Sequence, residues 1–105
     1  MPEEVKMDAE FFERADAVIR LANEQCQSVK SGKVSASCMY GVARFGAWLS
    51  ACGCSSGQHM REIKEQAVEY FVKQYRGMLE DNLDDYIENF EKYMTNTDRG
   101  LGKSC

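Results

Sequence analysis

Arg44 is the residue whose type and surroundings most favour chemistry in this sequence. It lies within SCMYGVARFGAWLSACGC, residues 37–54, where nearly every other side chain is small or apolar. A guanidinium in an apolar setting can bind a carboxylate or phosphate through two hydrogen bonds. Tyr40, one helical turn earlier, would add a hydroxyl on the same face. Arg44 and Tyr40 are therefore candidates for a ligand site or for a buried ion pair.

An intramolecular role for Arg44 is the favoured interpretation. A buried guanidinium needs a partner charge, and acids on the flanking segments can supply one: Glu13, Asp16 or Glu69. Alternatively, its head reaches water while its stem covers apolar surface.

The cysteines raise the question of a metal or redox site. Cys52 and Cys54 are followed by His59, which gives three zinc-type ligands within eight positions. Structural zinc sites normally use four ligands and C-x₂₋₄-C pairs, so the C-x-C spacing is one residue too short. Cys105, on a tail that is expected to be flexible, would have to complete the set. The prediction is that no metal or cofactor is bound, with Cys52, Cys54 and His59 as the weak candidates. The chain has five cysteines and no secretory signal, so reduced thiols are expected.

Charge and motifs exclude several classes of function. The net charge is −4, and the run EDNLDDYIENFE at residues 80–91 is the most acidic part of the chain. This balance disfavours nucleic acid as a partner. The run lacks an EF-hand loop pattern, so it is expected to be a solvated helix face. The sequence also lacks glycine-rich phosphate loops and the G-x-S-x-G elbow. Nothing in it supports an enzyme.

Apolar residues recur at spacings of three and four, which predicts helices throughout. The predicted helices span residues 8–27, 34–53 and 59–95, and 96–105 is expected to be a flexible tail. A chain of 105 residues is expected to form a single domain, 1–105. The predicted fold is an all-α bundle of three helices with a long third helix.

The second predicted helix, 34–53, is apolar or small on nearly every side. Such a helix is expected to be buried on nearly every side, so we place it centrally, between the other two. Trp48 is then a core residue, and Gly46 allows a neighbouring helix to approach closely.

The third predicted helix carries two apolar rows. The first comprises Ile63, Ala67, Phe71, Tyr75 and Met78. The second steps by 4, 3, 4 and 3, which is a heptad seam: Leu79, Leu83, Tyr86, Phe90 and Tyr93. At about 55 Å, this helix would overhang partners of about 30 Å. Either two chains pair through the seam, or the helix breaks near Gly77–Asn82 to give a fourth helix that folds back. Pairing is the favoured alternative.

Three segments resemble a small uncharacterised bacterial family, a domain of unknown function found mainly in proteobacteria. They are FFERADAVIRLANEQ, KVSASCMYGVARFGAW and EYFVKQYRGMLEDNLDDYIENF. The resemblance covers roughly residues 8–91 and implies an all-helical bacterial protein. It implies no activity and no catalytic residues.

The predicted function is a small interaction or structural module that self-associates as a homodimer through Leu79 to Tyr93. The alternative is a regulator that binds a small ligand through Arg44 and Tyr40, or a metal through Cys52, Cys54 and His59. The sequence has no apolar run long enough to span a membrane and no secretory signal. A cytoplasmic protein is expected.

Overall fold

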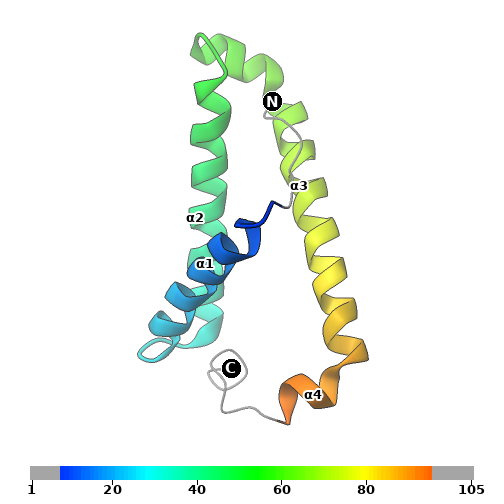
Figure 1. The fold of residues 1–105 in the computed structure, drawn as a ribbon. Coiled ribbons are helices and arrows are strands. Elements are labelled where there is room, and N and C mark those ends of the chain that lie inside the picture. Colours follow the sequence, from blue (N-terminus) through cyan, green and yellow to red (C-terminus); the bar gives the residue numbers. More distant parts are fainter. Residues whose placement is uncertain (1–7, 96–105) are drawn as a thin grey trace. The chain divides into compact units, whose positions relative to one another are not determined.

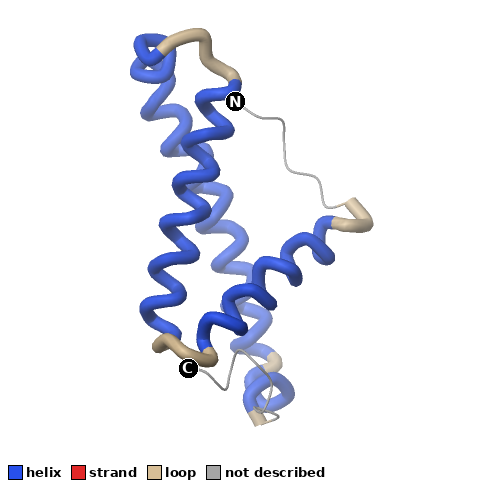
Figure 2. Tube along the Cα trace, turned by 90° about the vertical axis from the view of Figure 1, so that its left-hand side faces the viewer, coloured by secondary structure: helices blue, strands red, loops and turns tan. Residues whose placement is uncertain are grey.

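The described part of the chain is entirely helical in its regular structure. A computed structural model describes residues 8–95, and Figures 1 and 2 show them as helices joined by short turns, with no strand. The helices are α1 (Phe11–Cys26), α2 (Ser31–Cys52), α3 (Gly57–Glu88) and α4 (Phe90–Met94). The predicted all-α class and the long third helix are confirmed. The predicted tail, 96–105, lies outside the described residues.

The chain divides into two compact units, and the boundary falls inside α2 between Ala43 and Arg44. Within the described residues the units are 8–43 and 44–95. That the whole chain forms one domain stays a prediction.

The unit of residues 8–43 contains α1 and the first half of α2. The first turn of α1 is held by Asp8, whose carbonyl accepts a hydrogen bond from the Phe11 N–H and whose carboxylate pairs with Arg14 at 3.2 Å. The turn before α2 is shorter than predicted, because the Lys30 carbonyl accepts from the N–H groups of Lys33 and Val34 and starts the helix at Ser31. Val34 is the buried residue of this unit, with 4% of its surface exposed.

The unit of residues 44–95 contains the end of α2, α3 and α4. Ser56 caps α3, because its extended backbone lets the hydroxyl oxygen accept a hydrogen bond from the His59 N–H at 3.0 Å. Gly46 of α2 is buried against the ring of Phe71 on α3: a Cβ added at Gly46 would lie 3.5 Å from Phe71 Cζ. The predicted close approach at Gly46 is therefore present.

α3 ends at Glu88, seven residues before the predicted end at residue 95, and the predicted alternative break near Gly77–Asn82 does not occur. Asn82 does not cap a new helix, because its side chain instead donates to the Met78 carbonyl within α3, at 2.7 Å. The break lies at Asn89, whose φ of −117° and ψ of 29° leave the helical region. Asn89 donates from its side chain to the carbonyl and carboxylate oxygens of Asp85. Such local hydrogen bonds compete with helix continuation.

Contact with α3 does not bury α2 on every side, and the expectation that α1 covers the rest stays a prediction because α1 belongs to the other unit. Phe45 is 62% exposed and Trp48 is 58% exposed, although their rings contact each other with centroids 5.5 Å apart. Within the unit of residues 44–95, α2 meets α3 through its Gly46 side, and that contact leaves Phe45 and Trp48 uncovered. Trp48 is therefore not covered by α3.

Candidate interaction surface

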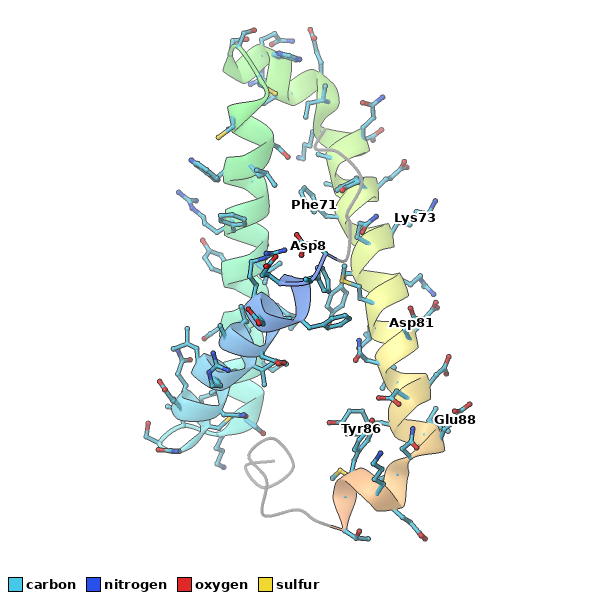
Figure 3. The ribbon with its side chains drawn as sticks, viewed as in Figure 1. Asp8, Phe71, Lys73, Asp81, Tyr86 and Glu88 are labelled. Atoms are coloured by element: carbon cyan, nitrogen blue, oxygen red, sulfur yellow. The ribbon has the colours of Figure 1, made fainter. Side chains whose placement is uncertain are left out.

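The main candidate surface is a row of six apolar side chains along α3, which we call the α3 stripe. Each of its residues has between 39% and 59% of its surface exposed. The stripe consists of Val68, Val72, Tyr75, Leu79, Leu83 and Tyr86. In Figure 3, the side chains of Phe71 and Tyr86 leave α3 on one side, while those of Lys73 and Glu88 leave it on the other.

Spacing places the α3 stripe on one face of the helix. The steps between its residues are 4, 3, 4, 4 and 3, so that an 11-residue repeat relates Val68 to Leu79, Val72 to Leu83, and Tyr75 to Tyr86. Such a repeat averages 3.67 residues per turn, close to the 3.6 of a straight α-helix. The stripe therefore runs along α3 for about 27 Å at 1.5 Å per residue, without winding around it.

A second face of α3 is half-buried, in contrast to the stripe. It includes Ile63, Ala67, Phe71 and Gly77. Tyr75 was predicted to share a row with the first three, but it is 54% exposed. A helical step of 100° places Tyr75 nearer to Leu79 than to Ile63, so Tyr75 belongs to the stripe.

Charge is distributed unevenly along the two halves of α3 and α4. Residues 57–76 contain four basic and three acidic residues, whereas 77–94 contain one basic and six acidic residues. The transition falls near the middle of the stripe, where Arg76 Nη1 lies 3.1 Å from Glu80 Oε2. Counted over all their faces, the helices are therefore acidic toward the C-terminal end and close to neutral toward the N-terminal end of α3.

The predicted heptad seam is divided between two helices. Leu79, Leu83 and Tyr86 lie on α3, whereas Phe90 and Tyr93 lie on α4, beyond the break at Asn89. Phe90 is 60% exposed, but Tyr93 is half-buried with its ring centroid 4.7 Å from that of Tyr86. The seam is therefore not one continuous helical row, and its role in self-association stays a prediction.

Arg44 and Tyr40 are both exposed side chains of α2, and the buried ion pair or ligand site expected at these two residues stays a prediction. Arg44 forms no ion pair with Glu69, the predicted partner within its own unit of the described chain. The Arg44 guanidinium is exposed to water. It therefore has no cost of burial that a nearby carboxylate would need to offset. Pairs with Glu13 or Asp16 would join the two units and stay predictions, as does a ligand at Arg44 and Tyr40.

The weak metal candidates occupy the turn between α2 and α3. Cys52 is exposed, and Cys54 and His59 are half-buried. The Nδ1 atom of His59 accepts a hydrogen bond from the Ser55 N–H at 3.1 Å, which assigns the proton of the neutral ring to Nε2. Within residues 8–95, no three His, Cys, Asp or Glu side chains are grouped so that they could hold a metal ion. Cys105, the predicted fourth ligand, lies outside the described residues.

Sequence reasoning missed Val68 and Val72 as members of the exposed surface. A heptad template starting at Leu79 explains Leu83 and Tyr86; continued toward the N-terminus it reaches Val72 but also the charged Arg76 and Glu69, and it misses Val68. The signal that finds the two valines is the 11-residue repeat, which links each of them to a leucine further along α3.

A family model described as "Protein of unknown function (DUF3144)" matches residues 11–87, so the chain belongs to that family. No curated protein and no solved structure gave a significant match. Among the described helices, none has the length and apolar character that crossing a membrane requires.

Proposed function

We propose that this member of the DUF3144 family is an interaction module that self-associates as a homodimer through the α3 stripe. The observation that supports the proposal is the exposure of six apolar side chains in one row on one helix. Burying apolar surface gains about 25 cal/mol per Å², and contiguous apolar patches on soluble proteins commonly mark interaction sites. Because the row is straight and unbroken, a second helix can cover it along its whole length.

The chemistry of the surface favours a protein partner over nucleic acid. The C-terminal half of α3 and α4 together carry six acidic residues against one basic residue. This charge would repel a phosphate backbone, whereas the apolar stripe beside it offers contacts that a helix can make. The four free cysteines of the described chain, Cys26, Cys38, Cys52 and Cys54, fit a reducing compartment. We therefore place the homodimer in the cytoplasm.

The test is a pair of variants on α3 that add the same charge on different faces. Leu83→Glu places a carboxylate within the stripe, and Gln66→Glu places one at an exposed position on another face of the same helix. Sedimentation equilibrium should find two chains per particle for wild type and for Gln66→Glu, and one chain for Leu83→Glu.

Circular dichroism checks that each variant keeps its helices. Leu83 is 53% exposed within the chain, so the glutamate should not unfold the protomer. A Leu83→Glu protein that still sediments as two chains would exclude the α3 stripe as the interface. Val72→Glu repeats the test at a second stripe position.

A further inference from the structure

We infer that Asn89 is a hinge, and that α3 and α4 interconvert between a bent form and a straight form in which they are one continuous helix. Figure 1 shows the bent form, in which α4 leaves the line of α3. All the residues concerned belong to the unit of residues 44–95. The inference goes beyond the proposed function, and it requires neither a second chain nor the position of the other unit.

The side chain of Asp85 holds the bent form. Its Oδ1 atom accepts a hydrogen bond from Asn89 Nδ2 at 2.9 Å, and its Oδ2 atom accepts one from the Tyr93 phenol at 2.9 Å. The Asp85 carbonyl oxygen also accepts from the N–H and from the side-chain amide of Asn89, each at 3.0 Å. Asp85 lies on α3 and Tyr93 on α4. These three residues, which we call the Asp85 cluster, therefore join the two sides of the hinge.

Straightening the hinge would separate Tyr93 from the residues that it contacts. At a rise of about 1.5 Å per residue, the Cα atoms of Tyr93 and Asp85 would be about 12 Å apart along a straight helix, and those of Tyr93 and Tyr86 about 10.5 Å apart. The side chains of a straight helix also lean in the same direction, toward its N-terminus. The hydrogen bond to Asp85 and the ring contact with Tyr86 at 4.7 Å therefore belong to the bent form.

The sequence across the hinge has the pattern of one continuous helix. Residues 78–94 contain neither glycine nor proline, the two residues that most disfavour a helix. The steps from Leu83 to Tyr86, then to Phe90 and to Tyr93, are 3, 4 and 3. Such steps place all four side chains on one face when the helix is straight. The apolar pattern therefore favours the straight form.

Charges across the hinge do not exclude the straight form. Glu88 precedes Lys92 by four residues, which is the order and spacing that stabilise a continuous helix. Glu91 follows Glu88 by three residues, and this pair of like charges offsets part of the gain. The bent form thus depends on the hydrogen bonds of the Asp85 cluster. Because such bonds replace bonds to water, their net contribution is small, and the two forms lie close enough in free energy to interconvert.

The hinge determines how far the apolar row of α3 extends. In the bent form Tyr93 contacts Asp85 and Tyr86 of its own chain. In the straight form Phe90 and Tyr93 continue the row beyond Tyr86 by seven residues, or about 10 Å. Any contact that requires the longer row is made only after the hinge straightens. The Asp85 cluster therefore controls that contact.

NMR of the whole chain tests the inference with two matched variants. Asp85→Ala removes the carboxylate of the Asp85 cluster, whereas Asp84→Ala removes the neighbouring carboxylate, which is not a member of it. Both variants replace aspartate by alanine within α3, so they raise helix propensity equally. Asn89 is unchanged in both, and its HN–Hα coupling reports its φ angle. That angle is −117° in the bent form and about −63° in a helix.

The expected result differs between the two variants. Wild type and Asp84→Ala should show a large coupling at Asn89 and a nuclear Overhauser effect between the rings of Tyr86 and Tyr93. In Asp85→Ala the coupling should fall toward the helical value and the ring signal should be lost. A new signal should join the Hα of Tyr86 to the N–H of Phe90, because these residues are about one turn apart in a straight helix.

Two results for Asp85→Ala would overturn the inference. An unchanged coupling with an unchanged ring signal would show that the bend is fixed. Chemical shifts of random coil at residues 90–94 would show that α4 unfolds instead of joining α3.

Tyr93→Phe tests the interconversion itself, because it removes only one hydrogen bond of the Asp85 cluster. It should give an intermediate coupling at Asn89, or two sets of Asn89 signals if exchange is slow. A coupling identical to that of wild type would contradict two forms of similar free energy.

Discussion

The phenol of Tyr93 donates a hydrogen bond to Asp85 Oδ2 at 2.9 Å, across the break that separates α4 from α3. The ring of Tyr93 also packs on Tyr86, with the centroids 4.7 Å apart. The short helix α4 is therefore held against the end of α3. Tyr93 therefore contacts residues of its own chain. Leu79 and Leu83 remain 42% and 53% exposed.

The hydrogen bond predicts a pH dependence. It raises the pKa of the Tyr93 phenol above the usual 10.0, with smaller contributions in the same direction from desolvation and from the charges of Asp85 and Tyr86. Because the folded-state pKa exceeds the unfolded one, the contribution of Tyr93 to stability is present below about pH 10 and is lost as the pH rises through the raised pKa. NMR of labelled tyrosine rings should show Tyr93 returning toward its usual pKa in Asp85→Asn but not in Asp84→Asn. Equal values in the two variants would contradict the assigned hydrogen bond.

Gly46 should tolerate a small side chain and reject a large one. A Cβ at Gly46 would meet Phe71 ring atoms at ordinary van der Waals distance, 3.5–3.7 Å. Gly46→Ala should therefore raise the free energy of unfolding by about 0.5–1 kcal/mol. Gly46→Leu overpacks the same contact and should lower it by about 1–3 kcal/mol. Urea denaturation measures both, and equal stabilities of the two variants would mean that α2 and α3 do not meet at Gly46.

Gly77 provides a contrasting position within α3. A Cβ there would meet nothing within 4 Å in the described chain, so the removal of glycine from the middle of a helix is the main effect. Gly77→Ala should stabilise the protein by about 0.5–1 kcal/mol. Loss of stability in the same urea assay would instead indicate that another helix, in the same chain or in a partner, contacts α3 closely at this point.

Trp48 should behave as a surface residue. Truncating a fully buried tryptophan costs about 3–5 kcal/mol, but Trp48 is 58% exposed. Trp48→Ala should therefore lower the free energy of unfolding by about 1 kcal/mol, through its lost contact with Phe45. Since Trp48 is the single tryptophan of the chain, acrylamide quenching reports on it directly. Quenching much weaker than that of a free indole would show that Trp48 is covered.

Periodicity was sufficient to predict the helical class, because apolar residues recur at helical spacing along the whole described chain. It was not sufficient to locate the end of α3. Asn89 lies between Tyr86 and Phe90 without interrupting the apolar pattern, and the break depends on its hydrogen bonds to Asp85, which spacing does not reveal.

The candidate surface was harder to predict than the fold. Apolar spacing shows which face of a helix avoids water, but it does not show what covers that face. Phe45 and Trp48 were expected in a core for this reason, whereas the contact of α3 at Gly46 leaves both of them uncovered. Helix length was the better guide, because the part of the third predicted helix that overhangs its shorter neighbours carries three members of the α3 stripe. This argument does not depend on burial. The three residues are Leu79, Leu83 and Tyr86.

The solution mass of the wild-type protein tests the proposed self-association most directly. It is measured by light scattering with reductant present, so that cysteines do not cross-link. Pairing through the α3 stripe predicts about 24 kDa, twice the 11.9 kDa of one chain. A mass near 11.9 kDa at micromolar concentration would contradict a homodimer formed through this surface.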